Sequence, residues 1–260
     1  MTGPIIDTNV YLSRWPTRRL PLDETAKLVE KLKAQGVVEA WVGSFDTLLH
    51  KDMASLNSRL AEECAAHKDV RLVPFGSVNP KLPDWEEDIR RCAEVHKMPG
   101  IRLHPNYHGY TLADPEFAAV VKAATERKLI VQLAVIMEDE RMMHPMFRAT
   151  AVDTKPLLEV VRKTPGLKLV LLNAVKNVKG EDLADLTMAG EVYVEIAMQE
   201  GVNGVETLLK SAPVERVLFG SFSPAFYFEA AQLKLQESPL ATPQVRAICE
   251  VNARRLLPRS

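Results

Sequence analysis

The sequence lacks an excess of charge of either sign. Its 260 residues include 33 basic and 34 acidic side chains, which leaves a formal net charge of -1 at pH 7. Nucleic acids and anionic membranes attract proteins through clustered positive charge, so this balance indicates neither a nucleic-acid partner nor a membrane partner. No apolar run reaches the ~18 residues that a membrane-spanning helix needs. The first residues also lack the basic and then apolar pattern of a secretory leader, so we expect a cytoplasmic protein.

Cysteine is scarce as well. Cys64, Cys92 and Cys249 are odd in number and far apart, and each lies in a stretch with helical periodicity. A disulfide framework or a cysteine-based metal site needs paired or closely spaced cysteines, so the sequence indicates neither. Hydrophobic residues, in contrast, make up 47% of the chain, which is enough for a substantial buried core.

Short apolar runs alternate with helical patterns along the whole chain. Each run and its helix together take about 30 residues, the length of one βα unit, and no linker separates the units. Eight such units favour a (β/α)8 TIM barrel, regular or distorted, that spans residues 1–260 as one domain and ends in a C-terminal helix. An open, doubly wound sheet is the alternative. The predicted strands are residues 4–11, 37–44, 70–80, 101–104, 129–136, 167–174, 192–197 and 217–221.

The stretch 99–110 carries the densest group of reactive side chains. Apolar and polar residues alternate over 101–104 as in a short strand, and Pro105 prevents further pairing. Ligands of parallel α/β proteins bind at the carboxyl ends of strands, so Tyr107 and His108 are expected to begin a binding loop. The alternative is a polar surface turn without a function.

Four short motifs occur in the order in which one protein family carries them: residues 5–8 (Ile-Ile-Asp-Thr), 100–105 (Gly-Ile-Arg-Leu-His-Pro), 218–221 (Leu-Phe-Gly-Ser) and 250–257, with an Asn-Ala-x-x-Leu-Leu pattern. Together they resemble the amidohydrolase-related (amidohydrolase-2) branch of the amidohydrolase superfamily, whose members are metal-dependent TIM-barrel hydrolases and decarboxylases. The resemblance spans the whole chain. It implies the same barrel and a site at the carboxyl ends of its strands.

The resemblance also implies a divalent metal, but the residues at the corresponding positions differ. By this correspondence, Asn9 and Tyr11 replace two histidine ligands, Ala134 and Asn173 replace ligands of the fifth and sixth strands, and Phe222 replaces an aspartate. Catalytic divalent metals need several imidazole or carboxylate ligands, and alanine and phenylalanine offer no lone pair. We therefore predict no metal and no other cofactor. Some lactonases of the superfamily are thought to work without metal, so the loss of the metal ligands does not by itself mean the loss of catalysis.

Four residues are candidates for proton transfer. His104 and His144 each follow a predicted strand, and imidazole titrates near neutrality. Glu195 lies at an inward strand position and is a candidate general base, as is Asp7 unless it only braces the barrel. The alternative for each histidine is a structural role, with a ring nitrogen bonded to a backbone carbonyl.

Further polar residues would bind the substrate. Arg102 with Arg141 would clamp a carboxylate through forked hydrogen bonds, unless Arg102 instead pairs with Glu138. The neutral donors Asn9, Tyr11 and Asn173 would polarise a carbonyl or hold a hydroxyl group of the substrate, unless they bind one another. The predicted substrate-binding residues are Asn9, Tyr11, Arg102, Tyr107, His108, Glu138, Arg141, Asn173 and Ser221.

The segment 137–153 is too long for an ordinary connection and follows the most apolar strand. We predict a lid that brings Arg141 or His144 into the pocket or packs on a second subunit through its methionines. A new metal site, formed by residues 138–140 with His104, His108 and His144, is a further alternative.

Two functional hypotheses remain. The first is an amidohydrolase-like hydrolase, lactonase-like in working without the usual metal, that acts on a small carboxylated or hydroxylated ester, lactone or amide. The second is a non-catalytic barrel that binds a small anionic metabolite or a partner subunit. We expect the partner to be a small-molecule, anionic substrate, and either hypothesis permits a homo-oligomer. The substrate stays open, because loop side chains set specificity on this fold.

Overall fold

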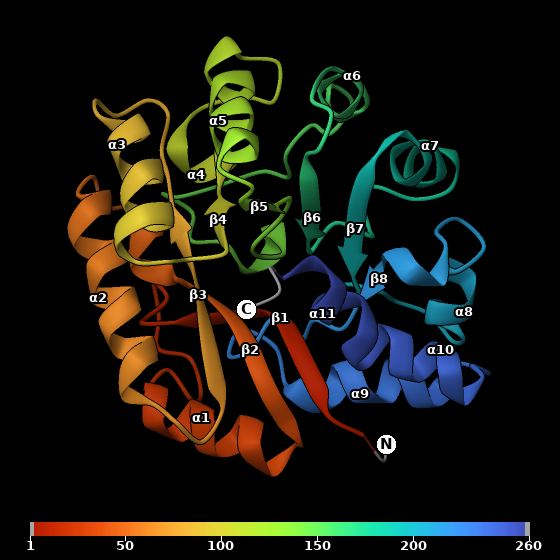
Figure 1. The fold of residues 1–260 in the computed structure, drawn as a ribbon. Helices are drawn as coiled ribbons and strands as arrows, with labels where there is room; N and C mark the ends of the chain where they lie inside the picture. Colours follow the sequence, from red (N-terminus) through yellow and green to blue (C-terminus); the bar gives the residue numbers. More distant parts are fainter. Residues whose placement is uncertain (1–2, 258–260) are drawn as a thin grey trace.

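The structure is a computed structural model that describes residues 3–257. Eight parallel strands form one sheet, in which each strand pairs with the next along the chain (Figure 1). The predicted (β/α)8 TIM barrel with a helical C-terminal part is therefore confirmed. The strands are β1 (Ile5–Leu12), β2 (Val37–Ser44), β3 (Arg71–Ser77), β4 (Gly100–Leu103), β5 (Ile130–Ala134), β6 (Lys168–Leu172), β7 (Glu191–Glu195) and β8 (Val217–Leu218).

The two edges of the sheet meet and close the barrel. β8 is short, so residues after it make most of the closing contacts. The backbone N–H of Thr8 donates to the carbonyl of Phe219 at 2.9 Å, and that of Tyr11 donates to the carbonyl of Ser223 at 2.9 Å. Val10 also forms a parallel bridge with Ser223. The alternative of an open, doubly wound sheet is therefore wrong.

Helices surround the sheet (Figure 1). None of those within residues 3–257 is long and apolar enough to span a membrane. The α-helices are α1 (Thr25–Ala34), α2 (Met53–Ala66), α3 (Trp85–Arg90), α4 (Pro105–His108), α5 (Pro115–Glu126), α6 (Leu157–Lys163), α7 (Glu181–Ala189), α8 (Gly204–Leu208), α9 (Phe228–Glu237), α10 (Thr242–Arg246) and α11 (Asn252–Leu256). Shorter turns are the 3-10 helices η1 (Phe45–Leu48), η3 (Glu140–Met142) and η4 (Val214–Arg216), and the π-helical η2 (Arg91–Val95) and η5 (Ala247–Val251).

Successive strand residues point to opposite sides of the sheet and build two separate cores. In β5, Val131 and Leu133 belong to the larger core beneath the helices, whereas Ile130 belongs to the smaller core that fills the barrel. Trp41 and Phe75 stack in this smaller core, with ring centroids 5.1 Å apart. The interior is thus apolar towards the start of the strands, and residues two positions further along each strand also face inward.

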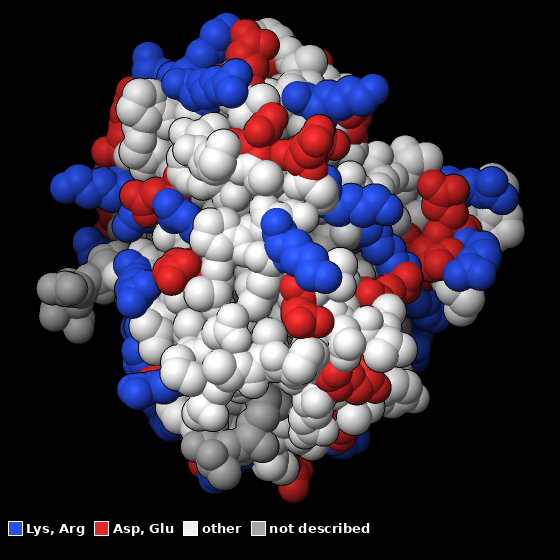
Figure 2. Space-filling model, turned by 90° about the vertical axis from the view of Figure 1, so that its right-hand side faces the viewer, with Lys and Arg blue, Asp and Glu red and all other residues white. Residues whose placement is uncertain are grey.

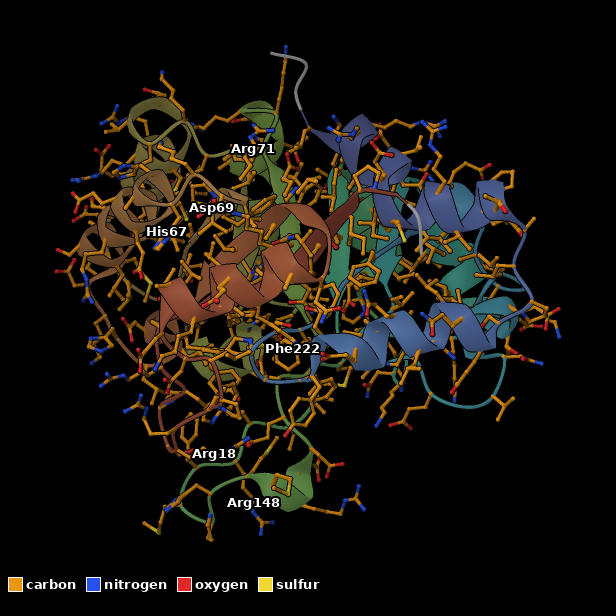
Figure 3. The ribbon with its side chains drawn as sticks, turned by 90° about the horizontal axis from the view of Figure 1, so that it is seen from below. Arg18, His67, Asp69, Arg71, Arg148 and Phe222 are labelled. Carbon is orange, nitrogen blue, oxygen red and sulfur yellow. The ribbon has the colours of Figure 1, made fainter. Side chains whose placement is uncertain are left out.

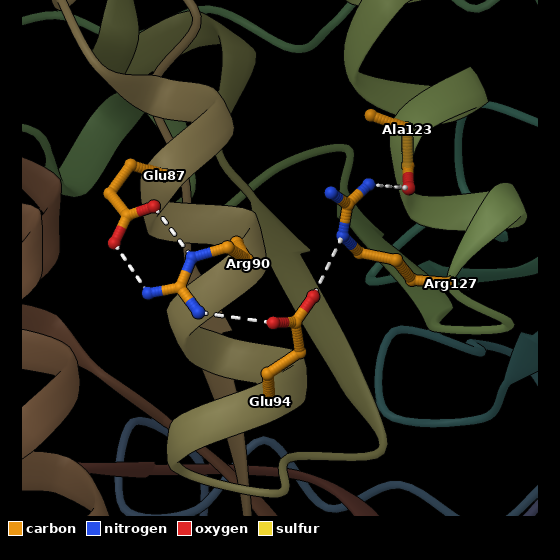
Figure 4. A network of polar contacts seen from close by, with 5 residues as sticks. All are labelled: Glu87, Arg90, Glu94, Ala123 and Arg127. Carbon is orange, nitrogen blue, oxygen red and sulfur yellow. Dashed lines mark hydrogen bonds and ion pairs between the residues drawn. The ribbon is translucent and has the colours of Figure 1, made fainter.

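Charges of both signs are scattered over the surface, in keeping with the balanced composition (Figure 2). Chains of ion pairs join neighbouring helices, and one of them runs from α3 to the end of α5 (Figure 4). Arg90 donates to Glu87 at 2.7 Å and to Glu94 at 3.0 Å, and Glu94 lies 3.9 Å from Arg127. Because these side chains are partly exposed, solvent screening leaves each pair little net effect on stability.

The cysteines pack inside the outer layer. Cys64 lies in α2, Cys92 in η2 and Cys249 in η5, and all three are buried. Burial raises the pKa of each thiol to about 12. They therefore act as small apolar residues of the core.

Candidate functional site

A cluster of buried polar residues lies inside the barrel, above the apolar interior core. Arg102, Gln132 and Glu195 occupy inward strand positions, because their chain neighbours belong to the outer core. None of the cluster residues is more than 1% exposed. The cluster consists of Asp7, Asn9, Tyr11, Arg102, His104, Gln132, Asn173, Glu195 and Ser221.

Arg102 has no exposed surface. Its Nε donates to Gln132 Oε1 at 2.7 Å, its Nη1 to the carbonyl of Val10 at 2.8 Å and its Nη2 to the carbonyl of Trp41 at 3.0 Å. The guanidinium therefore joins β4 to β1, β2 and β5. This geometry corrects the predicted anion clamp, because no donor edge faces solvent. The alternative pairing with Glu138 is wrong as well.

Tyr11 and His104 form a hydrogen-bonded pair, with 2.9 Å between the hydroxyl oxygen and Nε2. His104 Nδ1 is buried and has no hydrogen-bond partner among the described residues. Burial, followed by the nearby His108 and Arg102, lowers the pKa of His104 well below its usual value, so the ring is neutral at pH 7. The Tyr11 hydroxyl also lies 3.5 Å from Met137 Sδ, and Arg102 is a further neighbour that can donate to its oxygen. The pair thus offers a hydroxyl whose other acceptor is a weak one, and a neutral imidazole with an unpartnered Nδ1.

His108 lies in α4, at the place where the sequence predicted a binding loop. Its Nε2 lies 2.9 Å from the carbonyl of Thr47, which gives the ring a structural anchor. Its Nδ1 and the Tyr110 hydroxyl are buried without partners in the described part of the chain, and its ring centroid lies 5.8 Å from that of His104. Buried polar atoms of this kind are usually bound by ordered water or a ligand.

Asn9, Asn173 and Glu195 bind one another. Asn9 Nδ2 donates to Asn173 Oδ1 at 2.8 Å and to Glu195 Oε1 at 3.2 Å, and the backbone N–H of Asn173 donates to Glu195 at 2.6 Å. Asn173 adopts a left-handed backbone conformation, with φ of 55°. Burial raises the pKa of Glu195. With both carboxylate oxygens engaged, Glu195 orients the two amides and is a poor general base.

Asp7 and Ser221 form a second hydrogen-bonded group. Asp7 Oδ1 accepts from the backbone N–H groups of Asn9 and Ser221 at 3.1 and 3.0 Å, and Oδ2 accepts from the Ser221 hydroxyl. The Ser221 hydroxyl also lies 2.7 Å from that of Ser223. Burial nevertheless raises the pKa of Asp7 to about 7. Ser221, predicted to bind substrate, is therefore occupied by Asp7.

Two glycines make room for the charged members of the cluster. A Cβ atom at Gly43 would lie 2.9 Å from Arg102 Cδ and Nη1, and one at Gly220 would lie 2.4 Å from Glu195 Oε2. Contacts of this length do not occur in folded proteins, and neither carboxylate nor guanidinium is free to move. Glycine is thus required at both positions for the cluster to form.

The predicted lid residues Arg141 and His144 lie away from the cluster. Arg141 is 87% exposed at its side chain and donates to Asp139 at 2.8 Å. His144 is exposed, and its Nδ1 accepts a hydrogen bond from the backbone of Met146 at 3.2 Å. The structure therefore brings neither side chain to His104, because local partners hold both at the surface.

The segment 137–153 nevertheless covers the carboxyl end of the barrel. Figure 3 shows its Arg148 at the same end of the molecule as Arg18, beyond Phe222 and opposite Arg71. Tyr107 of α4 and Phe147 of the segment are both half-buried, and their ring centroids lie 5.5 Å apart. The segment also contributes a carboxylate, Glu138, which pairs with Arg18.

Sequence reasoning missed two residues of the site. Gln132 interrupts the apolar run of β5, and an isolated polar residue at an inward position was an available signal. Arg18 lies in a basic loop whose residues are not distinguished by spacing, so no pattern singled it out. Its importance depends on Glu138, which is distant in the sequence.

The cluster does not fit a catalytic divalent metal. Ala134 and Phe222 have no donor atom, and the amide nitrogen of Asn9 is directed at Asn173 and Glu195. Within the described residues, no three His, Cys, Asp or Glu side chains are grouped so that they could hold a metal ion. The alternative metal site, predicted from residues 138–140 with the three histidines, is therefore not formed among these residues.

Comparison with known families agrees with this architecture. The family model for amidohydrolases of the amidohydrolase-2 type matches residues 16–259. The chain therefore belongs to this amidohydrolase family, as its four short motifs predicted. A search of curated protein sequences found no relative.

Solved structures with the same fold include several decarboxylases. The 5-carboxyvanillate decarboxylase of Sphingomonas paucimobilis superposes with a TM-score of 0.76 at 14% identity, covering 98% of each chain. The IDCase of Metarhizium anisopliae gives 0.74 at 14% identity, covering 98% of this chain and 97% of the other. A dihydroxybenzoic acid decarboxylase of Polaromonas with bound manganese gives 0.71 at 12% identity, covering 98% and 97%. At such identities the likeness shows the fold alone.

Proposed function

We propose that this protein is a metal-independent hydrolase of the amidohydrolase family that acts on a small carboxylated or hydroxylated ester, lactone or amide. The observation that carries the proposal is the buried pair of Tyr11 and His104, 2.9 Å apart, with an unpartnered Nδ1 on the imidazole. Membership of the amidohydrolase family supports a hydrolytic reaction. The mismatch between the cluster and a divalent metal supports the metal-independent part.

The pair supplies the two functions that hydrolysis requires. When His104 Nε2 carries the proton and donates to the Tyr11 oxygen, the tyrosine hydrogen is directed elsewhere and is held only by the weak acceptor Met137 Sδ. A substrate carbonyl oxygen in place of this sulfur accepts the stronger hydrogen bond, which polarises the carbonyl. The neutral imidazole of His104 takes the proton from the attacking water at Nδ1, and then gives it to the leaving oxygen or nitrogen as the bond to the carbonyl carbon breaks.

The remaining polar residues position this pair. Arg102 lies 4.4 Å from the centroid of the Tyr11 ring, and Phe45 stacks on that ring at 4.6 Å. A ring held in this way keeps its hydroxyl directed at His104. Asn9 Oδ1 is unpartnered in the described residues and is available to accept a hydrogen bond from a substrate hydroxyl.

The first prediction concerns the proton-transfer pair. We expect His104→Gln to lower kcat about 10²- to 10⁴-fold, the usual contribution of a general acid–base group. Tyr11→Phe keeps the stacked ring and is expected to lower kcat, with a loss of about 1–3 kcal/mol of stability because the buried His104 ring loses its hydrogen-bond partner. The assay is hydrolysis of a panel of p-nitrophenyl esters and small lactones, with exposed His50→Gln as the matched control. An unchanged kcat in His104→Gln would overturn this role.

A second candidate function is a non-catalytic barrel that binds a small anionic molecule. It is favoured by the mutual hydrogen bonding of Asn9, Asn173 and Glu195, which leaves these groups little reactivity. Calorimetric binding of sugar acids and dicarboxylates, measured beside turnover of their esters and lactones, separates the two candidates. Binding without any turnover would favour this second function.

A further inference from the structure

The partners of Arg18 distinguish it from Arg102 and Arg141, the two arginines that the sequence predicted to bind an anionic ligand. Arg102 is fully buried, with all its nitrogen atoms donating to Gln132 and backbone carbonyls. Arg141 is bound through two nitrogen atoms to Asp139, two residues away. In Arg18, only Nη1 is engaged within residues 3–257, by Glu138, and 41% of the side chain is exposed.

The Arg18 guanidinium stands at the outer end of a column of aromatic rings. It lies 5.6 Å from the centroid of the Trp15 ring, which meets Phe45 edge-on at 5.1 Å. Phe45 in turn stacks on Tyr11 at 4.6 Å, and Tyr11 bonds His104. The packed rings of Trp15 and Phe45 therefore lie between the exposed cation and the proton-transfer pair.

Glu138 is the internal carboxylate that occupies this cation. Its side chain is only 8% exposed, and it follows Met137, whose sulfur contacts the Tyr11 hydroxyl at 3.5 Å. Met137 itself is 2% exposed and is joined to Glu138 through the backbone. A shift of Glu138 away from Arg18 would therefore also shift the residue that contacts the Tyr11 hydroxyl.

We propose that Arg18 is the residue that recognises the carboxylate of the ligand, and that the ligand opens the site by exchanging with Glu138. The proposal rests on the proposed function, because its ligand is the carboxylated molecule that the site would act on. A carboxylate replaces a carboxylate, so Arg18 keeps its charge partner while Glu138 turns to water. A neutral molecule of the same shape gains no such contact and leaves the mouth closed.

The chemistry limits the ligand to a small molecule with an unhindered carboxylate. Once Glu138 has left it, the Arg18 guanidinium matches a carboxylate bidentately. The carbonyl to be attacked would then lie towards Tyr11, on the side where Met137 contacts its hydroxyl. Dicarboxylate half-esters and lactones that carry a carboxylate have this arrangement.

A binding experiment tests the exchange without depending on turnover. Succinate and its neutral counterpart succinamide are titrated into the full chain at constant ionic strength, and the fluorescence of Trp15 is followed. Trp15→Phe identifies this signal against the other tryptophans. We expect succinate, and not succinamide, to change the fluorescence saturably.

Three variants assign the binding residue. We expect Arg18→Gln to weaken succinate binding about tenfold to a hundredfold, the usual effect of losing a charge-assisted hydrogen bond. Arg19→Gln is the matched control, because it removes the same charge one residue away from an arginine paired with Asp23, and it should bind as the wild type does. Glu138→Gln removes the competing carboxylate and should bind succinate more tightly.

The outcomes separate this proposal from the proposed function. Unchanged binding in Arg18→Gln, equal weakening in Arg19→Gln, or no saturable binding of succinate would overturn the exchange at Arg18. In Glu138→Gln, which lacks the competing carboxylate, hydrolysis of a neutral ester such as p-nitrophenyl acetate tests the Tyr11–His104 pair alone, because no ligand carboxylate is then needed to release Arg18. Succinate binding with no hydrolysis of any ester would keep the Arg18 site and overturn the hydrolase.

Discussion

At the scale of single residues, burial sets the protonation states of the cluster. It raises the pKa of Asp7 to about 7 and that of Glu195 above its usual value, and it lowers the pKa of His104. The hydrogen bonds that Asp7 accepts act in the opposite direction, but its complete burial outweighs them. The interior therefore favours neutral forms, while Arg102 keeps the one permanent charge.

The raised pKa of Asp7 predicts a specific pH dependence of stability. Between its ordinary pKa of 3.8 and about 7, the folded state binds a proton that the unfolded state has lost, so Asp7 makes the free energy of unfolding fall as pH rises. His104, with a lowered pKa, acts in the opposite sense below its usual value of 6.5, because the unfolded state then binds the additional proton.

Asp7→Asn should therefore make stability rise more steeply with pH between about 4 and 7, by up to about 1.4 kcal/mol per pH unit. Urea unfolding at a series of pH values measures the slope. Exposed Asp69, whose pKa is lowered by Lys33, provides the control variant Asp69→Asn, which should leave the slope in this range unchanged. Parallel curves for wild type and Asp7→Asn would contradict the raised pKa.

At the scale of elements, neighbouring strands reserve space for each other's polar side chains. Gly43 of β2 leaves room for Arg102 of β4, and Gly220, just after β8, leaves room for Glu195 of β7. The segment 137–153 shows the opposite case, since its position depends on separate contacts with α4 and the loop after β1. Strand ends are thus fixed by packing, whereas this segment is held by a few separate side-chain contacts.

The close approach of Gly220 and Glu195 gives a prediction at this scale. Gly220→Ala should destabilise the fold by about 1–3 kcal/mol, because its Cβ would lie 2.4 Å from a fully buried carboxylate oxygen. Adding Glu195→Ala removes the clash, so the double variant should be more stable than the sum of the single effects predicts. Thermal unfolding of all four proteins tests this coupling, with exposed Gly3→Ala as a neutral reference. Additive effects would show that the two residues do not collide.

At the scale of the whole molecule, periodicity and strand order predicted the barrel correctly. Alternating apolar runs and helices report local backbone preferences, and eight βα units have few ways to close. The site was harder to predict, because it depends on which inward residues meet across the barrel. Arg102 illustrates the difference: its inward position follows from the alternation in β4, but its partners on β1, β2 and β5 do not.

The same internal network leads to the last prediction, which concerns metal dependence. Hydrogen bonds from Arg102 to three other strands, together with those among Asn9, Asn173 and Glu195, hold the carboxyl ends of the strands together without any ion. A chelator should therefore leave both the Tm and any esterase activity unchanged, and protein purified without chelator should contain far less than one equivalent of zinc or manganese. Elemental analysis and thermal unfolding with and without EDTA measure these quantities. A stoichiometric metal whose removal lowers the Tm would contradict this account, because binding to the folded state alone stabilises it by mass action.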